Sequence, residues 1–167
     1  MPLINIQLTH EISPHQASQL AAGATKIMES ILGKKPELTA VNISVLEPKH
    51  WFIGNNKLSD TSDFSAQVIA KISENTNTEE QKAQAIDAFH ELLDEHYGPI
   101  NEVSYVQLDE IPTTDWGYGG KTQEERRIKR TSDGSVDTNY YLQKGKYLRS
   151  GLAWEYLAKL KSVFSRA

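Results

Sequence analysis

The sequence of 167 residues contains no cysteine, and none of its arginines occurs before Arg126. The first absence excludes disulfide frameworks, thiolate zinc sites and cysteine nucleophiles. The second means that no bidentate guanidinium contact to a carboxylate can come from the first 120 residues. There is no apolar run near about 18 residues, and the start Met-Pro-Leu-Ile-Asn lacks the basic segment of a secretory signal. We therefore expect a cytoplasmic protein.

Charge is divided unevenly along the chain. The first 120 residues hold 17 Asp and Glu, 7 Lys and no Arg, a formal charge of −10. The last 47 residues hold 11 Lys and Arg and 5 Asp and Glu, a formal charge of +6. The net charge of −4 hides this asymmetry, which is typical of parts with different partners.

The N-terminal region has the pattern of a β-α-β unit. Apolar and polar residues alternate over residues 3–8, which predicts a strand. Ser13-Pro14-His15-Gln16 forms a capping box with proline at the first helical position. Gly33 is placed to end this helix, and a second strand over residues 40–46 follows.

The same pattern recurs in the next part of the chain. A strand near residues 66–72 precedes the capping box Thr78-Glu79-Glu80-Gln81, and a helix ending at Gly98 leads to a strand over residues 103–108. Four matched pairs are each 65 residues apart, namely Gln16 and Gln81, Gly33 and Gly98, Trp51 and Trp116, and Gly54 and Gly119. Such self-similarity at a fixed offset indicates a duplicated unit.

The duplication predicts an α/β fold in which two tandem β-α-β units form a four-stranded mixed sheet. Each helix has one apolar stripe, so both should cover the same face of the sheet. We expect the other face to be buried by further subunits in a homo-oligomer. The expected segments are residues 1–58, residues 59–120 and a basic extension over residues 121–167 that includes an amphipathic helix.

Pro2 has a simple structural interpretation and a chemical one. A proline can merely start a strand, where its missing N–H donor is tolerated. If Met1 is trimmed, however, Pro2 becomes a secondary amine. In an apolar pocket the charged form of such an amine is disfavoured, so its pKa falls towards neutrality and it can act as a general base.

Pro2, the matched capping boxes, Glu110-Ile111-Pro112 and the ending Trp116-Gly117-Tyr118-Gly119-Gly120 together resemble the tautomerase superfamily. The nearest pattern is a pair of 4-oxalocrotonate tautomerase-like units fused in one chain, and the resemblance covers about residues 2–120. It implies an N-terminal proline as general base or acid and homotrimers of fused chains. The second unit has Ala66 in place of Pro2, so the resemblance implies one proline site per chain.

The arginines that the resemblance implies as substrate contacts are absent. The matching positions hold Ile12, Asn42, Glu74, Asn77 and Ser104. Asn42 is the candidate replacement, as a hydrogen-bond donor to a carbonyl or enolate oxygen, and it can equally well bond an adjacent backbone.

Two further residues are candidates for substrate binding. Lys71 is the cation nearest to the proline site by alignment, although a strand lysine is also typical of a solvated side chain. Trp51 falls where the resemblance implies an aromatic residue lining the proline pocket, and it can also pack at a subunit interface. His10 and His50 are weaker candidates as proton carriers, and no metal site or cofactor is expected.

The basic extension has three competing interpretations. It can pack on the acidic part of its own or a neighbouring chain, where Arg126, Arg127 or Arg130 would supply the missing contact to an anion. Its amphipathic helix, over about residues 147–164, can instead lie on an anionic membrane. Nucleic-acid binding is not expected, because the sequence pI is near 5.7 and no basic aromatic platform is present.

These observations predict a tautomerase-like enzyme. The N-terminal proline amine would transfer a proton on a small carbonyl or enol substrate in a keto–enol tautomerisation. The alternative is a non-catalytic protein of the same fold that binds a partner, a neighbouring subunit or an anionic membrane through its basic extension. The missing arginines favour the non-catalytic protein. Pro2, together with the motifs that resemble the tautomerase superfamily, favours the enzyme.

Overall fold

The computed structural model describes residues 2–129, 131–133, 135–140, 142–143 and 146. Contacts divide the chain into two compact units, Met1–Gln123 and Glu124–Ala167, and each is described by itself. The expected amphipathic helix over residues 147–164 lies outside the described residues. Of the helices that are described, none is both long and apolar enough to cross a bilayer.

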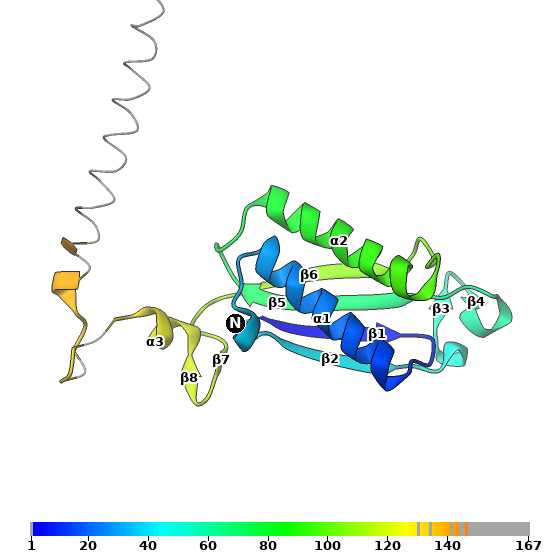
Figure 1. Ribbon diagram of the computed structural model, residues 1–167, viewed down its shortest axis with the longest axis horizontal. Coiled ribbons are helices and arrows are strands. Elements are labelled where there is room, and N and C mark those ends of the chain that lie inside the picture. The colour runs from blue at the N-terminus through cyan, green and yellow to red at the C-terminus, as the bar shows by residue number, and fades with distance from the viewer. Residues whose placement is uncertain (1, 130, 134, 141, 144–145, 147–167) are drawn as a thin grey trace, which may run out of the picture. The chain divides into compact units, whose positions relative to one another are not determined.

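The first unit is built on a four-stranded sheet with the order β2-β1-β5-β6 (Figure 1). The main elements are β1 (Leu3–Leu8), α1 (Pro14–Ser30), β2 (Ala40–Val45), β5 (Ala66–Ser73), α2 (Glu79–Tyr97) and β6 (Tyr105–Ile111). β1 pairs parallel with β2, β5 pairs parallel with β6, and β1 and β5 are antiparallel. Both helices cover one face of this sheet, so the predicted mixed sheet with two helices on one face is confirmed.

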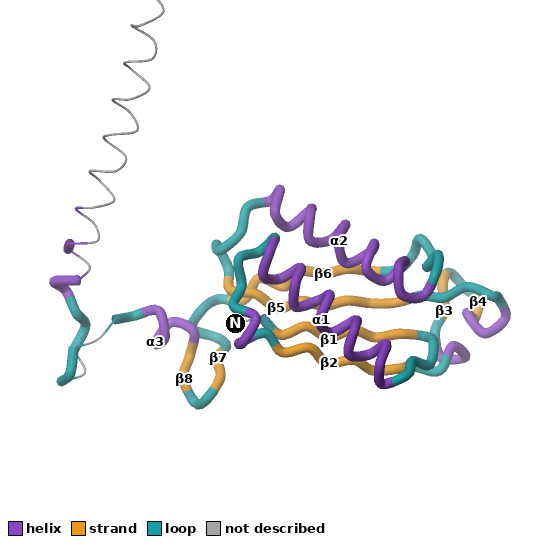
Figure 2. The backbone as a smooth tube through the Cα atoms, viewed as in Figure 1, coloured by secondary structure: helices purple, strands orange, loops and turns teal. Residues whose placement is uncertain are grey.

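Smaller elements follow each half of the sheet (Figure 2). One hairpin pairs β3 (Phe52–Ile53) with β4 (Asn56–Lys57), and a second pairs β7 (Gly117–Tyr118) with β8 (Lys121–Thr122). The short helical turns are η1 (Pro36–Leu38), η2 (Pro48–His50) and η3 (Leu58–Asp60). A five-residue helix, α3 (Gln123–Arg127), follows the second hairpin.

The duplication is visible in the backbone as well as in the sequence. Both main helices begin with a complete capping box, in which the side chain of Ser13 or Thr78 accepts from the backbone N–H three residues later. The two hairpins close alike, because Leu58 N donates to Trp51 O at 2.9 Å and the N–H 65 residues later, on Gln123, donates to Trp116 O at 2.9 Å. The repeat therefore extends to individual hydrogen bonds.

One hydrophobic core lies between the sheet and the two helices. Alternate residues of β1 and β5 face the helices and are buried, including Ile4, Ile6, Val68 and Ile72. The helices approach each other closely at Gly23, where an added Cβ atom would overlap Leu92 Cδ1. A helical glycine, which costs stability by itself, is thus explained by the packing of α1 on α2.

The face of the sheet away from the helices is open and largely polar in the single chain. Asn5, Asn42, Ile69 and Gln107 form one row across it, since the registers place them side by side. Tyr105 on the edge strand β6 is 65% exposed. A face of this kind is stable in water, and its polar groups need hydrogen-bond partners wherever it is covered.

The last strand begins later than the sequence pattern predicts. β6 starts at Tyr105 and not at Val103. Val103 N instead donates a hydrogen bond to Asn101 Oδ1 at 2.9 Å, which closes a local turn. Ser104 uses its side-chain oxygen to accept from Ala66 N at 3.2 Å. Side-chain hydrogen bonds thus take the place of the first backbone hydrogen bonds between β5 and β6. The alternation of apolar and polar residues does not reveal this.

The burial pattern predicts unequal effects of two truncations in α2. Phe89 is fully buried, whereas Ile86, one turn earlier, is 41% exposed. We expect Phe89→Ala to lower the free energy of unfolding by about 3–5 kcal/mol. Ile86→Ala, the matched control, should lower it by less than about 1 kcal/mol. Urea denaturation measures both, and equal losses would contradict this assignment of the core.

Candidate functional site

Pro2 lies at the start of β1 and is fully buried. Its carbonyl oxygen accepts from Ala40 N at 3.2 Å, which ties it to the start of β2. The next residue, Leu3, is opposite Lys71 in the antiparallel register, so Pro2 lies at the end of the sheet where β5 finishes. β6 finishes at this end too, because Ser73 pairs with Ile111.

The chain segment after α1 brings a lysine to this same end of the sheet. Gly33 has φ 63°, a left-handed conformation that favours glycine. The chain reverses there, and Lys34 N donates back to Met28 O at 2.9 Å, as in a Schellman motif. This turn fixes the backbone of Lys34 at the end of the helix.

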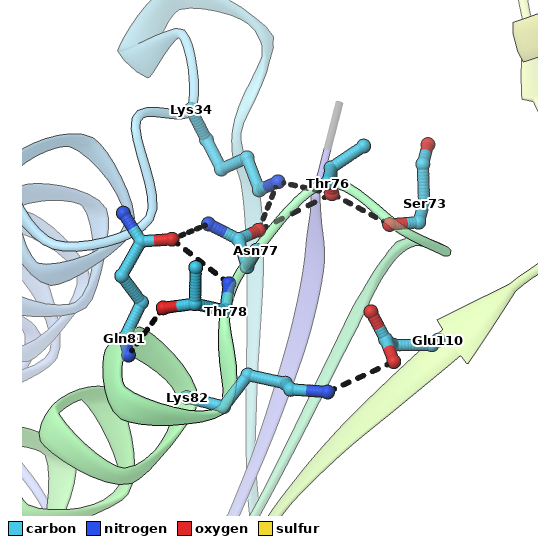
Figure 3. A network of polar contacts seen from close by, with 8 residues as sticks. All are labelled: Lys34, Ser73, Thr76, Asn77, Thr78, Gln81, Lys82 and Glu110. Atoms are coloured by element: carbon cyan, nitrogen blue, oxygen red, sulfur yellow. Dashed lines mark hydrogen bonds and ion pairs between the residues drawn. The ribbon is translucent and has the colours of Figure 1, made fainter. Parts of the chain in front are cut away.

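The side chain of Lys34 contacts the loop between β5 and α2 (Figure 3). Lys34 Nζ donates to Thr76 Oγ1 at 2.8 Å and to Asn77 Oδ1 at 2.6 Å. Thr76 Oγ1 in turn donates to Ser73 O at 2.6 Å, at the last residue of β5. An ammonium group has three N–H donors, so these two contacts leave it with capacity for a further acceptor.

Asn77 is oriented by its own partners. Its Nδ2 donates to Leu32 O at 3.0 Å and to Gln81 Oε1 at 3.2 Å. Because the amide nitrogen is engaged in this way, the amide oxygen is turned towards Lys34. Gln81 also belongs to the capping box of α2, accepting from Thr78 N at 3.0 Å. The helix cap therefore supports the position of the lysine.

Burial and a nearby carboxylate act in opposite directions on Lys34. Desolvation lowers the pKa of Lys34 below its ordinary value of 10.5, and the charge of Glu110 partly raises it again. Glu110 also forms an ion pair with Lys82, whose Nζ lies 3.0 Å from Glu110 Oε2. The desolvation effect is the larger of the two, so the ammonium is more easily deprotonated than that of an exposed lysine.

The chain does not bring the three predicted substrate-binding residues of its first unit onto the Pro2 side of the sheet. Lys71 pairs with Leu3, and both side chains lie on the open face of the sheet. Alternation along the strand places the Pro2 side chain on the opposite, buried face. Asn42 is exposed on the open face, where its Nδ2 donates to Asn5 Oδ1 at 3.4 Å. Trp51 follows η2, beyond the far end of β2.

The arginines of the basic extension belong to the second unit. Arg126 and Arg127 form the last turn of α3, and both take part in interactions within the structure. Arg130 lies outside the described residues. The expectation that one of them contacts an anion at Pro2 therefore stays a prediction. Across the part of the chain that is described, no group of three or more His, Asp or Glu residues lies together as a metal-ligand set.

Comparison with known proteins identifies the family. A family model for the tautomerase enzyme matches residues 2–61 and again residues 68–126. The chain belongs to the tautomerase family. The two matches correspond to the two repeats, and the fused tautomerase-like architecture inferred from the sequence is confirmed.

Individual relatives agree with this assignment. Probable tautomerase K2 of Dickeya dadantii (strain 3937) is 36% identical over 61 residues, which are 36% of this chain and 91% of that protein. A native fused 4-OT matches with a TM-score of 0.66 and 24% identity, over 73% of this chain and 96% of its own. A fused 4-OT described as an asymmetric trimer matches with a TM-score of 0.65 and 21% identity, over 75% and 98% of the two chains. The likeness to these solved structures shows the fold.

Sequence reasoning missed Lys34. Two lysines, Lys34 and Lys35, follow Gly33, and no local pattern separates them. In the structure Lys34 is half-buried and Lys35 is exposed. The deciding contacts come from Thr76 and Asn77, 42 and 43 residues further along the chain. Asn77, where the resemblance implies an arginine, thus holds a cation supplied by the first repeat.

The electrostatics of this family member predict the effect of removing the Glu110 carboxylate. Because Glu110 raises the pKa of Lys34, we expect Glu110→Gln to lower that pKa further. An NMR titration of the lysine side-chain carbons next to Nζ measures it. Glu47→Gln, which removes a carboxylate paired with Lys49, is the control and should leave Lys34 unchanged. An unchanged or raised pKa of Lys34 in Glu110→Gln would contradict the assignment.

Proposed function

We propose that this tautomerase-family enzyme uses the free amine of Pro2 as general base and acid on a small carbonyl or enol substrate that carries an anionic group. The observation that carries the proposal is the burial of Pro2 at the end of the sheet where the half-buried ammonium of Lys34 is held. The family assignment supports tautomerase chemistry, and the substrate class rests on these two residues.

In the proposed reaction the neutral amine of Pro2 removes a proton from the carbon next to a carbonyl group. Negative charge then develops on the carbonyl oxygen as an enolate forms. The protonated amine returns the proton to another atom of the same conjugated system, which completes a keto–enol shift. Burial of Pro2 favours the neutral, reactive amine.

Lys34 supplies the cation that the missing arginines would otherwise provide. Its remaining N–H donor capacity lets it bond a substrate carboxylate while Thr76 and Asn77 hold the ammonium in place. A lysine is a point charge and makes no bidentate contact. The proposed site therefore takes an anion with a single charge-assisted hydrogen bond from this residue.

We further propose that the chain forms a homotrimer that covers the open face of the sheet. Asn42 and Lys71 lie on that face, and Trp51 lies at the far end of the sheet from Pro2. In this proposal Asn42 and Trp51 contact only a substrate that is bound at the Pro2 site of a neighbouring chain. The fused 4-OT proteins of similar fold include structures described as trimers, which supports this arrangement.

Pro2→Ala tests the proposed base directly. Enol tautomerisation of phenylpyruvate is a convenient assay, and we expect the turnover number to fall by about a hundredfold or more. Intact mass of the active protein should show that Met1 is absent, because a retained Met1 turns the proline nitrogen into an amide without basicity.

Pro14→Ala is the matched control for this experiment. Pro14 occupies the first position of α1, and its replacement should leave turnover unchanged. Full activity of Pro2→Ala, or of protein that retains Met1, would refute the proline mechanism.

Lys34→Met tests the proposed anion contact. Loss of a hydrogen bond to a charged group costs about 1.5–3 kcal/mol, so we expect KM for an anionic enol substrate to rise about tenfold to a hundredfold with little change in kcat. In the unaltered enzyme KM should rise with pH as Lys34 loses its proton, starting below the ordinary lysine value of 10.5. The exposed neighbour provides the control, Lys35→Met, and an equal rise of KM in both variants would exclude a specific contact.

A further inference from the structure

A cavity of about 650 Å³ lies at the end of the sheet opposite Pro2. It is formed by Thr9 and His10 after β1, by Pro48 and Lys49 in η2, and by residues 58–59 and 61–64 of the segment 58–65 that joins the two repeats. Its volume is within the range of small-molecule sites in proteins, about 300–1,000 Å³. A second cavity of about 420 Å³ adjoins it and shares Thr9 and His10.

This cavity is the counterpart of the Pro2 end in the second repeat. Leu8 pairs with Ala66 at the start of β5, just as Pro2 lies at the start of β1. At this end the nitrogen in the place of the proline amine is the backbone amide of Ala66, which donates to Ser104 Oγ. The second repeat therefore has no basic amine where the first has Pro2, so the proton transfer proposed for Pro2 has no counterpart at this end.

Aromatic rings form one wall of the cavity. The ring of Phe64 lies 6.2 Å from that of His10, edge to face, and 5.1 Å from that of Tyr97. The Tyr97 hydroxyl is buried and has no hydrogen-bond partner among the residues described. Burial raises the pKa of Tyr97, so it stays a neutral hydroxyl whose oxygen can accept a hydrogen bond.

Carboxylates outnumber ammonium groups around the two cavities. Glu47 and Asp63 line the larger one and Glu11 lines the smaller one, whereas Lys49 is the single Lys or Arg among their lining residues. Lys49 is already paired with Glu47. Asp63 Oδ2 accepts from Asn101 Nδ2 at 2.8 Å, which orients this carboxylate. The local charge therefore disfavours an anion and favours a cation.

We propose that the cavity at the junction of the repeats is a second ligand site, which binds a small aromatic amine as its ammonium form. The ring of the ligand packs on the aromatic wall at Phe64 and Tyr97. The ammonium group lies near Asp63, where carboxylate charge and aromatic faces both attract a cation. The preference of this cavity for a cation is opposite to that of the anion-binding site proposed at Lys34.

Three probes of one shape test this proposal: phenethylamine, phenethyl alcohol and hydrocinnamate. Each has a phenyl ring on a two-carbon spacer, and they differ only in a cationic, neutral or anionic head group. Titration of the isotope-labelled full-length chain by NMR gives both the affinity and the location of each probe. We expect phenethylamine to bind at least about threefold more tightly than the alcohol, with shifts at Thr9, His10 and Phe64. Hydrocinnamate should bind here most weakly.

Paired variants separate the local carboxylate from the general acidity of the surface. Asp63→Asn should weaken phenethylamine about threefold or more and leave phenethyl alcohol unchanged. Asp60→Asn makes the same charge change in the same linker but does not line the cavity, and it should alter neither. Phe64→Leu keeps the apolar volume, removes the ring and should weaken both probes.

Several results would overturn the proposal. These are equal affinity for all three probes, no binding of phenethylamine, or an equal effect of Asp63→Asn and Asp60→Asn. The binding of phenethylamine should survive Pro2→Ala, and its loss there, with shifts at the Pro2 end, would assign the amine to the other site. This arm separates the proposal from the proline mechanism, since either can fail while the other stands.

Discussion

The six residues of β1 pair antiparallel with β5, from Leu3 opposite Lys71 to Leu8 opposite Ala66, and the rest of the first unit depends on this pairing. A single β-α-β unit has two strands and one helix, too little to bury a core of its own. Joined through β1 and β5, the two units form one sheet with a common core beneath both helices. The same pairing places the starts of the two repeats at opposite ends of the sheet.

The two ends have diverged although the backbone around them is repeated. At one end Pro2 is buried and Asn77, held by Leu32 O and by the cap of α2, receives the Lys34 ammonium. At the other end the linker between the repeats borders an open cavity with an aromatic wall and an excess of carboxylates. Side chains and chain connectivity, not the fold, therefore set the chemical difference between the ends.

What the sequence predicted was local, and what it missed depended on contacts between distant segments. The span of β1, both capping boxes and the left-handed Gly33 and Gly98 follow from residues close in sequence, and the 65-residue offset then implied the shared sheet. Lys34 was not distinguished from Lys35, because its burial depends on a loop more than 40 residues away. The exposed position of Asn42 on the open face, in contrast, follows from alternation along its strand.

The segment 58–65, which joins the repeats, limits the number of free chain starts, which duplication alone would not do. Two separate copies of the unit would present two chain starts, and each could carry a free terminal amine. Fusion converts one of those starts into the interior residue Ala66, whose nitrogen is committed to a peptide bond and to Ser104 Oγ. On the proposed mechanism, one peptide bond therefore sets the stoichiometry at one reactive centre for every two repeats and leaves the other end free to acquire a different specificity.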